Sequence, residues 1–187
     1  MSGNMTGKSV AILLASGFSE DHLTEIQKAL TTAKAKFKTV APEQGVVNGW
    51  QKTHWGHYFS VDTQIGDTLG SDFDFLVVIG GERSVSKLKS NLHTKRIVNH
   101  FFDAGKPVSA IGEGVELLAG VSKIAEMQIA IAAGEKEQEL KNAGAIISEN
   151  EIELYGHLLT ATDNKLEEWA GKTIELFSSY EEDQMAA

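Results

Sequence analysis

Glu113 is the ionisable residue best placed for chemistry, because it lies between two glycines in a tight turn, Gly112-Glu113-Gly114. The apolar stretch Val108–Ile111 before the turn is typical of a short strand, and a helix is predicted to begin near Val115. In α/β folds such an elbow lifts its apex out of the carboxyl edge of the sheet, where ligands and nucleophiles are placed. The apex is Gly112, which has no side chain, so acid/base catalysis by Glu113 is the chemistry that remains. The simpler interpretation of Glu113 is a first-turn carboxylate that interacts favourably with the helix dipole.

Ser19 is the second residue that could take part in chemistry at this edge. It precedes Glu20 and Asp21, so its first interpretation is the N-cap of a helix, and the alternative is a hydroxyl that bonds across to the elbow. Glycines after the first and third buried strands let other backbone approach closely. We therefore expect ligand contacts at one cleft, formed by Gly17, Ser19, Gly80, Gly81, Gly112, Glu113 and Gly114.

Two histidines, His54 and His57, stand three residues apart in the stretch THWGHY. On a helix this spacing would let both imidazoles bind one metal ion. The glycine between them and the hairpin-like context indicate that the stretch is not a helix. The spacing supplies no third ligand, so we predict no metal and interpret the aromatic stretch as packing or an interface patch. Glu116 is expected to be solvated or in an interface. The other histidines are isolated and expected at the surface or in the core: His22, His93, His100 and His157.

Composition describes a soluble globular protein of 187 residues, 42% apolar and 23% charged. One domain is predicted at residues 8–179, with flexible tails at 1–7 and 180–187. The net charge of -9 argues against nucleic acid as a partner, and the absence of cysteine excludes disulfides and thiolate catalysis. No cofactor is expected. No signal-like start or long apolar run is present, which predicts a cytoplasmic protein without a membrane partner.

Hydrophobic patterning predicts strands and helices that alternate along the chain, and hence a three-layer α/β domain. The expected buried strands are Ser9–Ala15, Phe37–Ala41, Phe73–Ile79 and Val108–Ile111. The expected helices run from Glu20 to about Ala35, over Val85–Phe102 as one long helix, over Glu135–Ala143 and over Lys165–Phe177. A hairpin is predicted from Val46–Trp50 and His57–Val61, a strand at Met127–Ala132, and pairing of Ala145–Ile147 and Ile152–Leu154 with Leu158–Thr160.

Four stretches occur in an order and spacing that resemble the ThiJ/PfpI family, within the class I glutamine-amidotransferase-like superfamily. They are Val10–Leu14 (VAILL), Gly17-Phe18, Phe75–Gly81 (FLVVIGG) and Gly105–Leu118 (GKPVSAIGEGVELL). The resemblance covers nearly the whole chain. It implies a flavodoxin-like three-layer α/β/α sandwich with a mostly parallel central sheet.

The sequence departs from the family at each position that carries its chemistry. Active members have a cysteine nucleophile at the elbow, a histidine after it and a glutamate after the first-turn Gly-Phe. These positions hold Gly112, Glu113 and Ser19. The elbow is most similar to the nucleophile-less carboxy-terminal domain of large-subunit catalases. The resemblance thus implies a non-catalytic, cysteine-less domain that binds a small ligand or protein partner near the elbow, in a stress-related role.

Two other functions stay open. One is hydrolase or lyase activity of the family type (peptidase or amidase, glyoxalase or deglycase), with Glu113 as acid/base and Ser19 or a histidine assisting. The other is a structural assembly module, because members of the family form dimers or larger rings. We predict at least a homodimer, because the aromatic stretch Trp50–Phe59 presents more apolar surface than a hairpin can bury alone.

Overall fold

A computed structural model of the chain describes residues 3–186, and its centre is a seven-stranded sheet in the order β11-β12-β8-β7-β1-β3-β6. All neighbouring strands are parallel except β11 and β12, which form an antiparallel hairpin. The central strands are continuous apolar runs because helices cover both of their faces. The strands are β1 (Ser9–Leu13), β3 (Lys36–Ala41), β6 (Thr63–Gln64), β7 (Phe75–Val78), β8 (Val108–Ile111), β11 (Ile152–Tyr155) and β12 (Leu158–Ala161).

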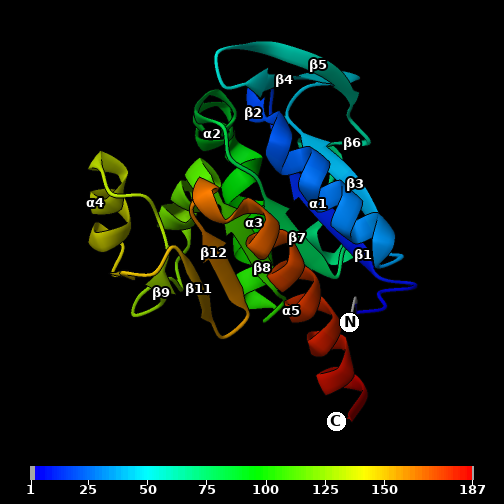
Figure 1. Cartoon of the computed structure of the whole chain (residues 1–187), viewed down its shortest axis with the longest axis vertical. Coiled ribbons are helices and arrows are strands. Elements are labelled where there is room, and N and C mark those ends of the chain that lie inside the picture. The colour runs from blue at the N-terminus through cyan, green and yellow to red at the C-terminus, as the bar shows by residue number, and fades with distance from the viewer. Residues whose placement is uncertain (1–2, 187) are drawn as a thin grey trace.

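Helices lie on both faces of this sheet, so the three-layer α/β/α sandwich is confirmed (Figure 1). Side chains alternate along each strand: Phe75 and Val77 face one core, and Leu76 and Val78 face the other. One face is covered by α1 (Glu20–Thr32) and α5 (Leu166–Ala186), the other by α2 (Glu82–Lys89), α3 (Leu92–Asp103) and the 3-10 helix η3 (Gly112–Gly120).

Two small sheets and short helices complete the chain. The predicted hairpin is present as β4 and β5, and β2 pairs with β4 in the same three-stranded sheet. These strands are β2 (Phe18–Ser19), β4 (Val46–Gln51) and β5 (His54–Ser60). The other small sheet joins β9 (Gln128–Ile129) to β10 (Ile146–Ile147), with α4 (Glu135–Asn142) between them in sequence. The short helices are η1 (Ile65–Asp67), η2 (Gly70–Asp72) and η4 (Asp163–Lys165).

Three helix predictions were wrong in their bounds. The long helix over Val85–Phe102 is two helices, because the Asn91 side chain accepts a hydrogen bond from the His93 N–H (2.9 Å) and caps a new helix. The elbow helix is of 3-10 type and begins at Gly112, before Val115. The last helix continues beyond Phe177 to Ala186.

Two strand predictions also need correction. Met127–Ala132 contributes only the two residues of β9, and Ala145–Ile147 pairs with β9 rather than with Leu158–Thr160. Ile152–Leu154 does pair with Leu158–Thr160, as predicted. At the other end of the chain Met5 is fully buried and its N–H donates to Ala33 O (2.8 Å), so the packed fold begins before residue 8.

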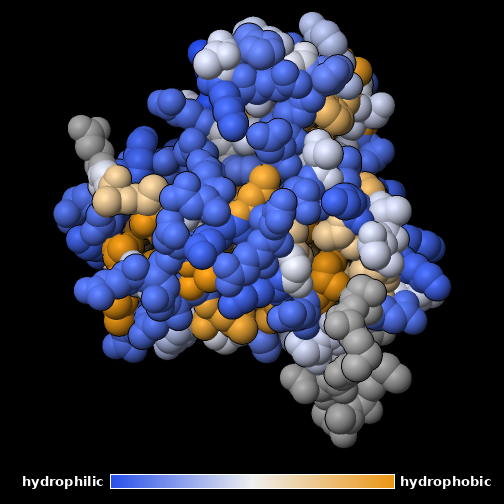
Figure 2. Space-filling view, in the orientation of Figure 1, coloured by the Kyte–Doolittle hydropathy of each residue, from blue (hydrophilic) through white to orange (hydrophobic). Residues whose placement is uncertain are grey.

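The surface agrees with the acidic, polar composition. The face with α1 and α5 is mostly hydrophilic, and hydrophobic surface shows there in patches, one of them on the side of α4 and β9 (Figure 2). No helix within residues 3–186 is long and apolar enough to cross a membrane.

The sheet order decides which loops meet at the carboxyl edge. Because β1, β7, β8 and β12 are parallel, their carboxyl ends all lie at the same edge. The segments that follow them start at Leu14, Ile79, Gly112 and Thr162. Ligands of open α/β sheets bind outside this edge, so the functional site is built from these four segments.

Candidate functional site

Gly112 adopts the left-handed backbone conformation expected at the apex of an elbow, with φ of +58°. The space above its Cα is already occupied. A Cβ placed on Gly112 would press against the carboxylate oxygen Oδ1 of Asp163 and would lie 3.1 Å from His22 Cε1. The Asp163 carboxylate therefore fills the space that an apex side chain would need.

A histidine fixes this carboxylate in place. His22 Nδ1 accepts a hydrogen bond from the Gly80 N–H (3.0 Å), so the ring proton is on Nε2, which lies 3.0 Å from Asp163 Oδ1. The His22 side chain is 4% exposed, whereas that of Asp163 is 60% exposed. The hydrogen bond from His22 lowers the pKa of Asp163 and outweighs the opposing effect of partial burial. Asp163 thus presents a carboxylate that stays ionised.

Glu113 contacts a different helix from its own. Its Oε2 accepts a hydrogen bond from the N–H of Gly81 (3.0 Å), the N-cap residue of α2. The amino-terminal N–H groups of a helix lack partners within the helix and attract negative charge. The Glu113 carboxylate therefore caps α2 from the elbow.

Ser19 occupies the N-cap position of α1, but its side chain makes no capping hydrogen bond, so that part of the prediction was wrong. Its N–H donates to Gly80 O (2.9 Å). A Cβ on Gly81 would come within 2.8 Å of the Ser19 nitrogen and 2.5 Å of Gly17 O, which shows how closely the first and third turns approach. The structure therefore brings together four of the residues predicted to form the cleft, namely Gly17, Ser19, Gly80 and Gly81.

Gly114 has a packing role beside the cleft. A Cβ on Gly114 would lie 2.8 Å from the carbonyl oxygens of both Val78 and Ile79. The absence of a side chain lets the start of η3 pack directly on the end of β7.

A pocket of about 200 Å³ opens beside the elbow. Glu116 lies in its wall with its side chain only 10% exposed, paired with Lys89 (3.2 Å) and Lys136 (3.9 Å), so the expectation of a solvated Glu116 was wrong. Burial lowers the pKa of Lys89, but hydrogen bonds to Glu139 and Glu116 raise it by more. The pocket is lined by Gly112, Glu113, Glu116, Ile131, Ala132, Ala133, Gly134, Lys136 and Asp163.

His22 and Asp163 were not among the site residues predicted from the sequence. The expectation of an isolated His22 at the surface or in the core overlooked its position in the first turn of the helix after β1. Asp163 stands two residues after the end of β12, the strand beside the elbow strand. Position relative to a parallel strand was the signal that could have identified both.

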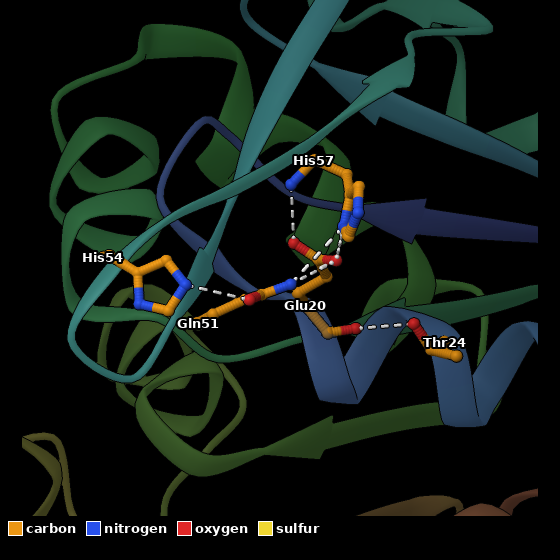
Figure 3. A network of polar contacts seen from close by, with 5 residues as sticks. All are labelled: Glu20, Thr24, Gln51, His54 and His57. Carbon is orange, nitrogen blue, oxygen red and sulfur yellow. Dashed lines mark hydrogen bonds and ion pairs between the residues drawn. The ribbon is translucent and has the colours of Figure 1, made fainter.

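A second polar network joins the hairpin to α1 (Figure 3). The buried Glu20 carboxylate accepts hydrogen bonds from the His57 N–H (2.9 Å) and Gln51 Nε2 (3.0 Å), and contacts His57 Nδ1. Burial raises the pKa of Glu20, but these hydrogen bonds outweigh it and lower the pKa overall. His54 Nε2 bonds Gln51 Oε1 (3.1 Å). Over the described residues, no three histidine, aspartate or glutamate side chains are grouped so that they could hold a metal ion.

The aromatic residues of the hairpin divide between packing and exposure. The Arg83 guanidinium lies 3.9 Å from the centre of the Trp50 ring, and Trp55 packs edge-on against Trp50 (5.3 Å between centres). Tyr58 is 72% exposed and Trp55 is 47% exposed. The hairpin therefore has both a packed side and an aromatic surface patch.

Comparisons with known proteins agree with the fold. Residues 8–176 match the model of the DJ-1/PfpI family. General stress protein 18 of Bacillus subtilis is 31% identical over 147 residues, which cover 78% of this chain and 83% of that protein. Protein/nucleic acid deglycase 2 of Escherichia coli is 27% identical over 153 residues, 78% of this chain and 82% of that protein. A solved ThiJ/PfpI domain protein from Brachyspira murdochii superposes with a TM-score of 0.82 at 21% identity, covering 94% of this chain and 99% of that one, and shares the fold.

Substitution of the apex should destabilise the protein. We expect Gly112→Ala to lower the free energy of unfolding by roughly 1–3 kcal/mol, because alanine is strained at positive φ and its Cβ presses on Asp163. Gly120→Ala, in the same 3-10 helix but with open space at its Cβ, should change it by less than about 0.5 kcal/mol. Denaturant titration measures both. Equal stability of the two variants would show that Asp163 does not occupy the apex space.

The His22–Asp163 pair should appear in the pH dependence of stability. A carboxyl whose pKa is lower in the folded protein than in the unfolded chain stabilises fully above the unfolded value, and that contribution is lost as pH falls through the folded value. The difference in unfolding free energy between wild type and Asp163→Asn should therefore shrink as pH falls below the ordinary aspartate pKa of 3.8. Carbon-13 NMR of the carboxyl should place the Asp163 pKa below 3.8. An unshifted pKa would contradict the pairing.

Proposed function

We propose that this chain, which belongs to the DJ-1/PfpI family, binds a small amine-bearing ligand in its elbow pocket and performs no thiol chemistry. One observation carries the proposal: the ionised Asp163 carboxylate occupies the space above Gly112 where an elbow nucleophile would project. A ligand-binding site has replaced a nucleophile at the same place in the fold.

The hydrogen bonds at the elbow favour binding over catalysis. Both nitrogens of His22 are engaged, one by the Gly80 N–H and one by Asp163, so the imidazole has no free lone pair with which to activate water. A carboxylate with a lowered pKa is a weak base, and it is well suited to accept hydrogen bonds from a charged donor.

The pocket has the charge and shape for a short ammonium compound. The lining of the pocket includes the carboxylates of Asp163 and Glu113, and the one cation among its described lining residues, Lys136, is paired with Glu116. The wall of Ile131–Ala133 offers apolar contact for a short carbon chain. A volume of about 200 Å³ is smaller than the pockets that hold drug-sized ligands, so it limits the ligand to a few non-hydrogen atoms.

A role in stress responses is part of the same proposal. It is supported by the similarity to a relative named general stress protein 18, and by the resemblance of the elbow at Gly112–Leu118 to the nucleophile-less catalase domain. We also propose a cytoplasmic location.

The enzyme alternative keeps Glu113 as its acid/base. One oxygen of Glu113 caps α2, which supports a structural use of this carboxylate, and Glu113 also lines the elbow pocket, where a substrate would bind. Hydrolysis of a peptide or amide, or deglycase or glyoxalase turnover, that disappears in Glu113→Gln would overturn the non-catalytic proposal.

Binding can be tested with a matched pair of probes, butylammonium and butyrate. We expect butylammonium to cause saturable amide shifts at Gly112, Gly114 and Ala133 in nitrogen-15 NMR spectra. Asp163→Asn should weaken this binding by about tenfold or more, because a charge-assisted hydrogen bond becomes a neutral one.

The control for this test is Asp103→Asn, because the Asp103 side chain is 59% exposed, close to the 60% of Asp163, and lies on α3. It should leave binding unchanged. Butyrate binding as tight as that of butylammonium, or butylammonium binding that survives Asp163→Asn, would contradict the proposed ligand class.

We also propose that the chain self-associates through the hairpin. Exposed Val46, Trp55 and Tyr58 form the aromatic and apolar patch that supports this. Light scattering should give at least a dimer at micromolar concentration, and Tyr58→Glu should shift it towards the monomer. A wild-type monomer across that range would contradict self-association.

A further inference from the structure

Helix α4 is held to the rest of the protein by few apolar contacts. Among its described side chains only Leu140 is buried. Figure 1 shows α4 at the edge of the molecule, beside the packed layers rather than within one. A segment with little buried apolar surface is drawn from the low-stability part of a structure.

Helix α4 and the residues just before it, together residues 131–142, lie between two cavities. Residues Ile131–Ala133 line the elbow pocket and also a neighbouring pocket of about 680 Å³. Lys136 faces the elbow pocket, while Glu137 and Lys141 face the larger one. Movement of residues 131–142 would therefore join the elbow pocket to the larger cavity.

The two ends of the segment are attached differently. At its carboxyl end the Ala145 N–H donates to Leu140 O (3.0 Å), and Gly144, with φ of +94°, accepts from the Glu126 N–H (2.9 Å). At the other end, over the described residues, no hydrogen bond ties the backbone of Ile131–Ala133 to the body. Just before these residues, the buried Ala130 donates its N–H to Thr160 Oγ1 (2.8 Å). The geometry is that of a flap attached at Ala130 and near Gly144, with Ile131–Ala133 over the elbow.

A small group of charges holds this flap down. Lys89 on α2 lies between Glu139 on α4 (2.9 Å) and Glu116 on η3 (3.2 Å), and Lys136 on α4 is 3.9 Å from Glu116. Of these pairs, Lys89–Glu139 and Lys136–Glu116 join α4 to the body, and each has one side chain about half exposed, Glu139 at 49% and Lys136 at 50%. Ion pairs with an exposed partner are weak and are screened by salt. The Lys89–Glu139 pair therefore forms a latch that can open.

We infer that residues 131–142 are a hinged lid, latched by Lys89, that controls access to the elbow pocket. Its purpose rests on the proposed function, because a lid matters only if the pocket takes a ligand. When the lid lifts, the elbow pocket opens into the larger cavity, and when it closes, Lys136 and the Ile131–Ala133 wall complete the site.

The test uses the absence of native cysteine, which makes introduced cysteines the only labelling sites. Spin labels are placed at Lys95→Cys on α3 and Gln138→Cys on α4, both exposed, and their distance is measured by pulsed electron resonance on ligand-free protein. We expect one distance at low salt and a second, longer population in 1 M sodium chloride or with Lys89→Met.

The matched control is Lys141→Met, which removes an ion pair to Glu137 inside α4 and leaves the latch intact. It should not change the distances. A single distance under all conditions, or equal effects of Lys89→Met and Lys141→Met, would overturn the lid. If the lid opens but butylammonium does not bind, only the proposed function is contradicted. If butylammonium binds but the distance between the spin labels stays the same under all conditions, only the lid is contradicted.

Discussion

The two hydrogen bonds of His22 are the constraint on which the elbow depends. A buried imidazole has to satisfy both nitrogens, and His22 does so with the Gly80 N–H and the Asp163 carboxylate. This pairing draws the segment after β12 towards the end of β7 and places a carboxylate over Gly112. Glycine at position 112 and the Asp163 carboxylate above it therefore depend on each other. A larger residue at position 112 would need the space that this carboxylate occupies.

The elbow has its shape with glycine at the apex because the contacts around it require that shape. Gly112 retains a positive φ, Gly114 packs on the carbonyl groups that end β7, and Glu113 caps α2. Each contact joins the start of η3 to another element at the carboxyl edge. Glycine adopts this positive-φ conformation without the strain that a residue with a side chain would bear there, and packing holds the geometry.

The layers of the fold could be predicted from the sequence, but the pair of residues at the centre of the site could not. Apolar runs such as Phe75–Val78 report burial on both faces, which is a local signal, and the glycines of the turns mark the close approaches of backbone. The His22–Asp163 pair joins residues 141 positions apart, and neither has a distinctive neighbourhood in sequence. The bounds of the long helix were predicted wrongly for a similar reason. The apolar pattern is unbroken there, and a single polar side chain, Asn91, separates one helix from the next.

The first turn of α1 connects the two polar networks of the molecule. Glu20 and His22 are two residues apart, and side chains at that spacing point to different sides of a helix. Glu20 therefore faces the hairpin and bonds His57 and Gln51 (Figure 3). His22 faces the elbow and bonds Asp163. Both side chains belong to the same helical turn, so the hairpin and the elbow each bond to that turn. The aromatic surface patch and the elbow pocket, far apart along the chain, are thus attached to the same few residues.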